Sequence, residues 1–134
     1  MNNTEIVQKG YECFGNGDIA GLLALFSDDI RWSIPEIENA AFAGSRQGKP
    51  AVAEFFRLLN EGEDITKFAP AEFLADGDKV VVLGETTATV RSTGKTYSTD
   101  WVHIFTVADG KVTNFLEFFD NAAATRAFQK TLAA

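Results

Sequence analysis

The sequence is poor in cysteine, histidine and positive charge. Cys13 is the one cysteine of the chain and His103 its one histidine. An internal disulfide is therefore impossible, and a zinc site built from the usual nitrogen and sulfur ligands is not expected. The 12 Lys and Arg residues stand against 19 Asp and Glu residues, which gives a formal net charge of −7. An acidic chain without a basic cluster argues against nucleic acid and anionic membranes as partners.

Sequence signals for membranes, phosphate groups and metal ions are also missing. No apolar run is long enough to span a bilayer, and the opening MNNTEIVQKG contains no apolar signal core. The sequence has no glycine-rich phosphate loop, metal-ligand constellation or nucleophile elbow. We therefore expect a cytoplasmic protein that uses neither a metal nor another cofactor, and that binds neither nucleic acid nor membranes.

The sequence does contain a large apolar fraction. Hydrophobic residues make up 46% of the 134 residues, and the chain has 12 Phe against only 2 Tyr. This composition is far from that of a disordered chain. It predicts one folded domain over residues 1–134, with a hydrophobic core of its own.

The first half of the chain carries mainly helical patterns. Apolar residues at helical spacing predict a helix around Ile6–Phe14, a second after the capping residue Asp18, and a third that begins at Pro50. Between the second and third helices we expect a short strand, a terminating proline and a loop, over Ile30–Ile34, Pro35 and 36–48. The charged stretch Glu61–Asp64 is interpreted as a solvated turn that ends the third helix.

Four strand-like runs follow the third helix. They cover residues 66–75, 79–91, 95–108 and 111–120, and they are separated by the turn sequences Asp76-Gly77-Asp78, Thr93-Gly94 and Asp109-Gly110. Separators this short predict an antiparallel meander. A last Ala-rich helix is predicted over Asn121–Leu132. Helices grouped apart from strands indicate an α+β fold, in which the helices cover one face of a curved sheet.

The turn at Asp109-Gly110 joins the two strands that carry the candidate site. An Asp-Gly pair between apolar runs is a strong hairpin signal. If Ala108 pairs with Lys111, His103 lies opposite Leu116, and Glu117 is diagonal to His103 or one step away, depending on the register. Alternation along the strands predicts two sets of side chains that each share a face: Trp101, His103 and Phe105, and Phe115, Glu117 and Phe119. If the two sets lie on the same face, an imidazole and a carboxylate meet in aromatic surroundings.

The opposite face of these strands is apolar as well. A sheet with one solvated face alternates cleanly between apolar and polar residues, and these strands do not. The predicted helices can cover only one face, so the other needs a partner. A twofold homodimer is the commonest solution, and we expect it to form through the sheet, at Val102, Ile104, Leu116 and Phe118.

The order of these elements resembles the nuclear-transport-factor-2-like fold over essentially the whole chain, within its SnoaL-like and ketosteroid-isomerase-like branch. The resemblance rests on the sequences Gly17-Asp18, Phe26-Ser27-Asp28-Asp29-Ile30-Arg31-Trp32-Ser33-Ile34-Pro35, Gly44, Gly48-Lys49-Pro50-Ala51-Val52, Asp76-Gly77-Asp78-Lys79-Val80-Val81-Val82 and Asp109-Gly110-Lys111-Val112, and on Asp120. It implies a cone-shaped domain in which N-terminal helices pack on a curved, mainly antiparallel sheet and enclose a pocket. It implies no single activity, since this fold hosts isomerases, cyclases, hydrolases, dehydratases and binding proteins.

The resemblance also allows a comparison of site residues. Ketosteroid isomerases place an Asp base just before the proline that follows the first strand, and that position here is Ile34. Their first-helix tyrosine corresponds to Gly10 when counted without gaps, and Tyr11 is rotated from it by about 100° on a helix. Their acid on the penultimate strand corresponds to His103. Steroid isomerisation by that mechanism is therefore not expected.

Two other branches of the fold offer further comparisons. SnoaL-like polyketide cyclases look closer, because they place a histidine and an acid on the last two long strands, where this chain has His103 and Glu117. Epoxide hydrolases of this fold need two carboxylates bridged by an arginine. The sequence indicates one pocket-facing carboxylate, and Arg91, near a strand end, is a poor candidate for the bridge.

Two functions remain open from the sequence. In the first, Glu117 is the base and His103 the acid, oxyanion donor or positioning group of an isomerase, cyclase or dehydratase acting on an apolar carbonyl compound. In the second, the chain binds or carries a small apolar molecule unchanged, and the His–Glu pair only satisfies buried hydrogen bonds. In either case we expect the ligand pocket to be lined by Trp32, Phe55, Leu59, Trp101, Phe105, Phe115 and Phe119.

Overall fold

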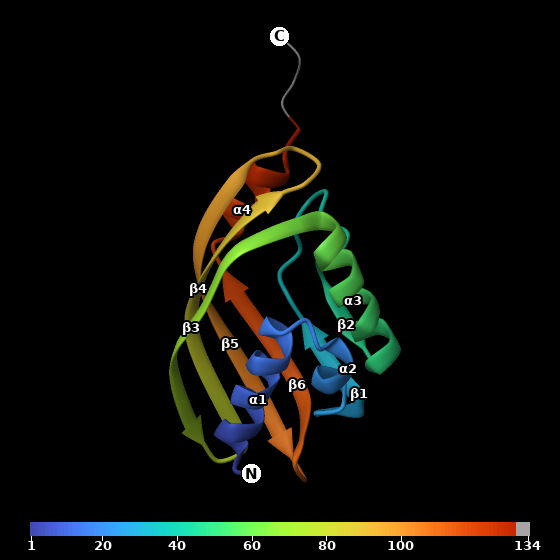
Figure 1. The fold of residues 1–134 in the computed structure, drawn as a ribbon, viewed down its shortest axis with the longest axis vertical. Helices are drawn as coiled ribbons and strands as arrows, with labels where there is room; N and C mark the ends of the chain where they lie inside the picture. The colour runs from blue at the N-terminus through green and yellow to red at the C-terminus, as the bar shows by residue number, and fades with distance from the viewer. Residues whose placement is uncertain (131–134) are drawn as a thin grey trace.

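The computed structural model describes residues 1–130 and consists of helices packed on a curved six-stranded sheet (Figure 1). The helices are α1 (Asn3–Gly15), α2 (Ile19–Leu23), α3 (Lys49–Gly62) and α4 (Asn121–Phe128). The strands are β1 (Phe26–Ser33), β2 (Ser45–Gln47), β3 (Glu63–Asp76), β4 (Lys79–Val90), β5 (Thr96–Ala108) and β6 (Lys111–Phe119). The predicted α+β cone fold is confirmed.

Side-chain caps explain where three of the helices begin. Asn2 and Glu5 form a capping box at the start of α1, each accepting a hydrogen bond from the backbone of the other. Asp18 accepts from the backbone N–H of Gly21 in α2, as its position in the sequence predicts. Asp120 accepts from the N–H of Ala123 and caps α4. The predicted end of this last helix at Leu132 lies outside the described residues, and α4 itself ends at Phe128.

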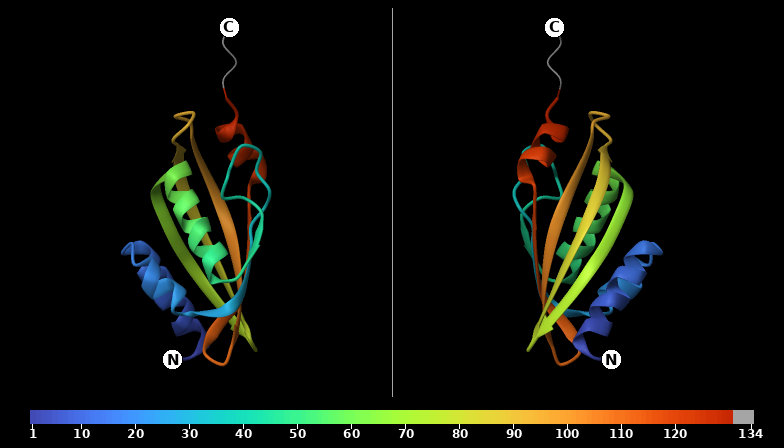
Figure 2. Two further views of the ribbon diagram at one scale, coloured as in Figure 1. Left: turned by 90° about the vertical axis from the view of Figure 1, so that its right-hand side faces the viewer. Right: turned by 90° about the vertical axis from the view of Figure 1, so that its left-hand side faces the viewer.

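The strands lie in the order β2-β1-β6-β5-β4-β3. Strands β3 to β6 form the predicted antiparallel meander, and β1 joins its β6 edge in parallel. Two details differ from the prediction: β1 begins at Phe26 rather than Ile30, and the predicted loop 36–48 contains the short strand β2, which pairs with β1. The side views show α1 and α3 on one side of the curved sheet (Figure 2).

A β-bulge in β6 corrects the predicted register of the hairpin. Ala108 pairs with Lys111 as expected, and Val107 pairs with Val112. Thr106, however, pairs with Asn114, so Thr113 is an extra residue in β6. The extra residue shifts all later pairs by one, and His103 lies opposite Glu117 instead of Leu116. Because a shift of one residue exchanges the two faces of a strand, the bulge places Glu117 on the same face as His103.

The concave side of the sheet and the helices share one continuous core. The side chains of Ile30, Val52, Val80, Val82 and Val90 are fully buried. Aromatic rings fill much of the remaining space, as in the stack of Trp32 on Phe115, whose ring centroids are 3.9 Å apart. Among residues 1–130, no helix is long and apolar enough to cross a membrane.

The outer face of the sheet keeps its apolar side chains exposed in a single chain. Phe118 is 53% exposed and Leu116 36%, while Val102 and Ile104 are partly exposed. The homodimer through this face stays a prediction. An interface of standard size would bury on the order of 800 Å² of each copy.

We expect sedimentation velocity at micromolar concentration to give the mass of two chains. Phe118→Asp places a charge in the centre of this face, and we expect it to give the mass of one chain. The control Gln8→Asp changes an exposed position of α1 and should sediment like the unaltered protein. A wild-type protein that sediments as a monomer would contradict the predicted dimer.

Candidate active site

An apolar cavity of about 120 Å³ lies between the helices and the concave face of the sheet. Strands β1, β3, β4, β5 and β6 contribute to one wall, and α1, α2 and α3 contribute to the others. The structure places all seven aromatic and aliphatic residues of the predicted pocket along these walls, together with His103 and Glu117: Trp32, Phe55, Leu59, Trp101, Phe105, Phe115 and Phe119. Hydrophobic walls with a few polar groups are typical of sites for small molecules.

Three polar side chains form a continuous hydrogen-bonded chain in this cavity. The Nε2 atom of His103 lies 2.6 Å from Oε2 of Glu117, and its Nδ1 atom lies 2.7 Å from the hydroxyl oxygen of Tyr11. The imidazole ring stacks on Trp101 with 3.8 Å between ring centroids. His103 is 4% exposed. Both ring nitrogens are therefore in use, and the ring is held on its face as well as at its edges.

The state of Tyr11 favours one direction for these hydrogen bonds. Burial, and then the charge of Glu117, raise the pKa of Tyr11 well above its ordinary value. The phenol thus keeps its proton and is able to donate it to Nδ1 of His103. In the tautomer that accepts this hydrogen bond, the ring proton is on Nε2, which donates to Oε2 of Glu117. This arrangement leaves the second carboxylate oxygen of Glu117, Oε1, for a ligand.

Tyr11 is a site residue that the sequence comparison rejected. Counting without gaps places the isomerase tyrosine at Gly10, and a rotation by one residue predicts that the Tyr11 side chain points away from the site. In the structure Tyr11 faces the sheet and contacts His103. A Cβ atom on Gly10 would lie 3.3 Å from Leu22, so the Gly10 side of α1 faces α2. The apolar spacing of Val7, Tyr11 and Phe14 is the sequence signal for the inward face.

Glu63 and Tyr97 form a second polar pair that lines the same cavity. The Tyr97 hydroxyl donates to Oε2 of Glu63. Burial raises the pKa of Glu63 to about 7; the hydrogen bond from Tyr97 opposes this rise, and the negative charge of Glu117 adds to it. Burial also raises the pKa of Tyr97 above its ordinary value.

The position of Glu63 corrects the interpretation of Glu61–Asp64 as a solvated turn. Glu63 is the first residue of β3 and is 5% exposed, whereas Asp64 is exposed. Helix α3 passes directly into the strand, with no turn between them. Strand alternation places Glu63 on the same face as Ile65, which also lines the cavity. That shared spacing with Ile65 is the signal that predicts its burial.

The two tryptophans of the cavity differ in their hydrogen bonding. The indole N–H of Trp101 donates to Oγ1 of Thr86 over 2.7 Å. Gly84 lies directly beneath this ring, where a Cβ atom would clash with the indole. The indole N–H of Trp32 is buried and has no partner among the described residues.

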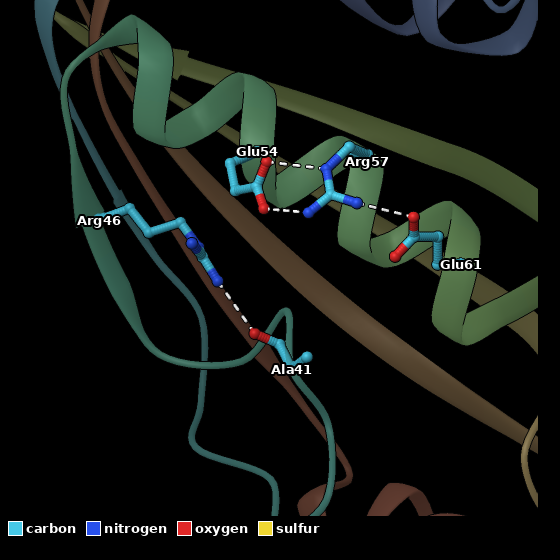
Figure 3. A network of polar contacts seen from close by, with 5 residues as sticks. All are labelled: Ala41, Arg46, Glu54, Arg57 and Glu61. Atoms are coloured by element: carbon cyan, nitrogen blue, oxygen red, sulfur yellow. Dashed lines mark hydrogen bonds and ion pairs between the residues drawn. The ribbon is translucent and has the colours of Figure 1, made fainter.

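The arginines near the cavity are held by other groups. Arg57 pairs with Glu54 and Glu61 on the outer side of α3, and Arg46 donates to the carbonyl of Ala41 (Figure 3). The guanidinium of Arg91 donates to the carbonyl of Asn60. The cavity thus has two carboxyl groups rather than the single one predicted, but their hydrogen-bond partners are His103 and Tyr97. Within residues 1–130, no group of three or more side chains is arranged to hold a metal ion.

Comparison with known proteins places this fold and site in a family. The model of the SnoaL-like domain matches residues 7–115, which includes Tyr11, Glu63, Tyr97 and His103. The chain belongs to the SnoaL-like domain family. The resemblance stated from the sequence is therefore confirmed. The bulge at Thr113 lies near the end of the matched residues, and Glu117 lies two residues beyond them.

Proteins with similar sequences, some with solved structures of the same fold, match this SnoaL-like chain over nearly its whole length. A nuclear-transport-factor-2-like protein of Burkholderia xenovorans is 38% identical, with 95% of each chain covered and a TM-score of 0.86. TerC, crystallised with polyporic acid, is 32% identical, with 94% of this chain and 97% of TerC covered and a TM-score of 0.82. An uncharacterised protein of Mycobacterium tuberculosis is 26% identical over 92% of this chain and 93% of its own length.

Proposed function

We propose that this chain is a cofactor-independent acid/base enzyme for a small apolar carbonyl compound. The hydrogen-bonded chain of Tyr11, His103 and Glu117 inside an apolar cavity carries this proposal. Glu117 is the base, and its Oε1 atom takes a proton from the carbon next to the carbonyl group. Loss of that proton begins an isomerisation, a cyclisation or a dehydration, depending on the ligand.

His103 acts in this proposal as a positioning residue. Its two nitrogens already bind Glu117 and Tyr11, so donation to a ligand would require one of these hydrogen bonds to break. The hydrogen bond from Nε2 fixes the carboxylate of Glu117, and the hydrogen bond from Tyr11 fixes the tautomer that makes this possible. Stacking on Trp101 holds the ring in place.

The cavity walls indicate the kind of ligand. Aromatic side chains from α1, α3, β5 and β6 surround the polar chain, and such walls favour flat apolar groups. TerC, which was crystallised with polyporic acid, supports an organic small molecule as the occupant. A single carbonyl group placed near Glu117, with an apolar remainder against the rings, fits this distribution.

A binding or carrier protein without catalysis is the second candidate. Ile34 is the observation that favours it, because this buried side chain lines the cavity where the resemblance to ketosteroid isomerases expects the base. A protein of this kind would use Glu117 and His103 only to satisfy buried polar groups.

Exchange of carbon-bound hydrogen distinguishes these two functions. Benzylacetone, an aliphatic ketone that carries a phenyl ring, is incubated with the protein in heavy water. Proton NMR follows the loss of the signals of the hydrogens on the carbons next to the carbonyl group. We expect the protein to accelerate this exchange over buffer. Line broadening that shows binding, without accelerated exchange, would support the carrier function instead.

A further inference from the structure

Glu63 and Tyr97 are polar groups of the cavity that the reaction proposed above leaves without a role. The carboxyl group of Glu63 accepts a hydrogen bond from Tyr97 at Oε2. Within the described chain, Tyr97 is the side chain that hydrogen-bonds this carboxyl group. The other oxygen, Oε1, is left for a ligand. This oxygen is not among the fully buried side-chain atoms that lack a partner, so a small molecule or water can reach it.

Glu63 lies where the inner cavity meets an outer groove between α1, α3 and β3. The groove has a volume of about 850 Å³. It shares seven residues with the cavity, and these form the boundary between the two spaces: Tyr11, Phe14, Phe56, Leu59, Glu63, Ile65 and Phe68. Glu63 therefore borders both the inner cavity and the solvent-facing groove.

Among the described residues, no cation forms an ion pair with Glu63. Arg91 and Asp64 line the groove beside it, but the guanidinium of Arg91 donates to the carbonyl of Asn60 and Asp64 is exposed. Arg57 is paired with two glutamates of its own helix. Inside the cavity, Glu63 faces Tyr97 and the negative charge of Glu117. With its pKa near 7, Glu63 is protonated in a substantial fraction of molecules at neutral pH.

We propose that Glu63 is a general acid that works with the base Glu117, and that the pair removes water from apolar β-hydroxy carbonyl compounds. The proposal rests on the proposed function, in which Glu117 takes a proton from carbon. A base alone suffices for that proton transfer. Departure of a hydroxyl group needs a second group that supplies a proton to the oxygen.

The elimination balances without any further reactant. Oε1 of Glu117 takes the proton from the carbon next to the carbonyl, and the electrons of that C–H bond form the carbon–carbon double bond. The C–O bond of the β-hydroxyl group breaks, and Glu63 gives its proton to the departing oxygen. The products are an unsaturated carbonyl compound and water. Glu63 then regains a proton from solvent on the side of the groove, and Glu117 releases the one it took.

Two parallel assays on the full chain test this inference. The aldol adduct of benzaldehyde and acetone carries a β-hydroxyl group, and its dehydration to benzalacetone is followed by ultraviolet absorbance. Benzylacetone has no such hydroxyl group, so its exchange in heavy water reports proton abstraction alone. We expect the wild-type protein to catalyse both reactions. Glu63→Gln should lower dehydration by about a hundredfold, and by a far larger factor than it lowers exchange.

Two further variants separate chemistry from structure. Glu72→Gln is the matched control, because it changes an exposed acid of the same strand, away from the cavity and the groove, and we expect it to dehydrate at the wild-type rate. Tyr97→Phe removes the hydrogen bond that lowers the pKa of Glu63. The loss of dehydration activity on the alkaline side should therefore move to higher pH in this variant. If Tyr97 only supported the fold, its replacement would leave the alkaline limb of the pH–rate profile at the same pH.

The outcomes distinguish this inference from the proposed function. Equal losses of exchange and dehydration in Glu63→Gln, or an unmoved alkaline limb in Tyr97→Phe, would overturn the role of Glu63 and leave Glu117 as the base. A wild-type protein that exchanges benzylacetone but leaves the aldol adduct intact would do the same. A wild-type protein that accelerates neither reaction would contradict the proposed function, and the inference with it.

Discussion

Replacement of Glu117 by glutamine is expected to lower the exchange of benzylacetone by about a hundredfold or more. Glutamine has nearly the same shape, and its amide oxygen can still accept the hydrogen bond from Nε2 of His103. The hydrogen-bonded chain to Tyr11 is therefore retained, while the group that takes the proton is lost. Rates are measured by proton NMR in heavy water, with each variant at the same concentration.

A matched variant and a binding measurement complete this test. Asp100 lies on β5, is exposed and points to the opposite face of the sheet from His103, so Asp100→Asn should exchange at the wild-type rate. Glu117→Gln should still bind benzylacetone with little loss, because the aromatic walls are unchanged. Exchange that persists at the wild-type rate in Glu117→Gln would mean that another group is the base.

Replacement of Glu63 by glutamine is expected to remove much of the pH dependence of folding stability. The pKa of Glu63 rises from 4.5 to about 7 in the folded chain, so the folded state holds a proton that the unfolded state has lost between these values. The stability that this proton contributes is fully present below the unfolded pKa and is lost as the pH rises through the folded pKa. A shift of this size corresponds to roughly 3 kcal/mol.

Urea unfolding at about pH 5 and about pH 8 measures this effect. The wild-type protein should lose stability between the two, and Glu63→Gln, which carries no ionisable group there, should lose much less. Asp64→Asn keeps the buried carboxyl group and should retain the wild-type dependence. If the wild type and Glu63→Gln lost equal amounts of stability between these two pH values, Glu63 would be solvated or charged in the folded protein.

The sequence is sufficient to predict most of the fold because its turn chemistry is local. The residues of Asp109-Gly110 adopt positive φ angles, which the Asp-Gly pair favours, and Asp18 and Asp120 cap the helices that follow them. Such signals depend only on near neighbours along the chain. The short strand β2 carries no comparable signal, because its three residues are fixed by pairing with β1.

The pairing of His103 with Glu117 could not be predicted from local sequence signals. A regular hairpin from Asp109-Gly110 would place Leu116 opposite His103. The bulge at Thr113 changes this register, and its position depends on how β6 packs against β1 and the helices. The alternation of the strand therefore identified two candidate faces, while tertiary packing decided that Glu117 and His103 share one.

Tyr11 and Glu63 were missed for two different reasons. The position of Tyr11 was compared with another branch of the family by counting residues. On a helix, an offset of one residue turns the side chain by about 100°, so such a count can select the wrong side chain. Glu63 lies in a run of charged residues, where composition favours solvent. Its burial follows from the direct passage of α3 into β3 and from the hydroxyl of Tyr97, which is 34 residues away in the sequence.

A crystal structure of the protein with benzylacetone tests the central claim most directly. The account predicts that the carbon next to the carbonyl lies within about 3.5 Å of Oε1 of Glu117, with the phenyl ring against the aromatic walls of the cavity. The hydrogen bonds of His103 with Glu117 and with Tyr11 should be intact. A ketone bound in the cavity with its carbonyl end turned away from Glu117, or bound only outside the cavity, would contradict the account.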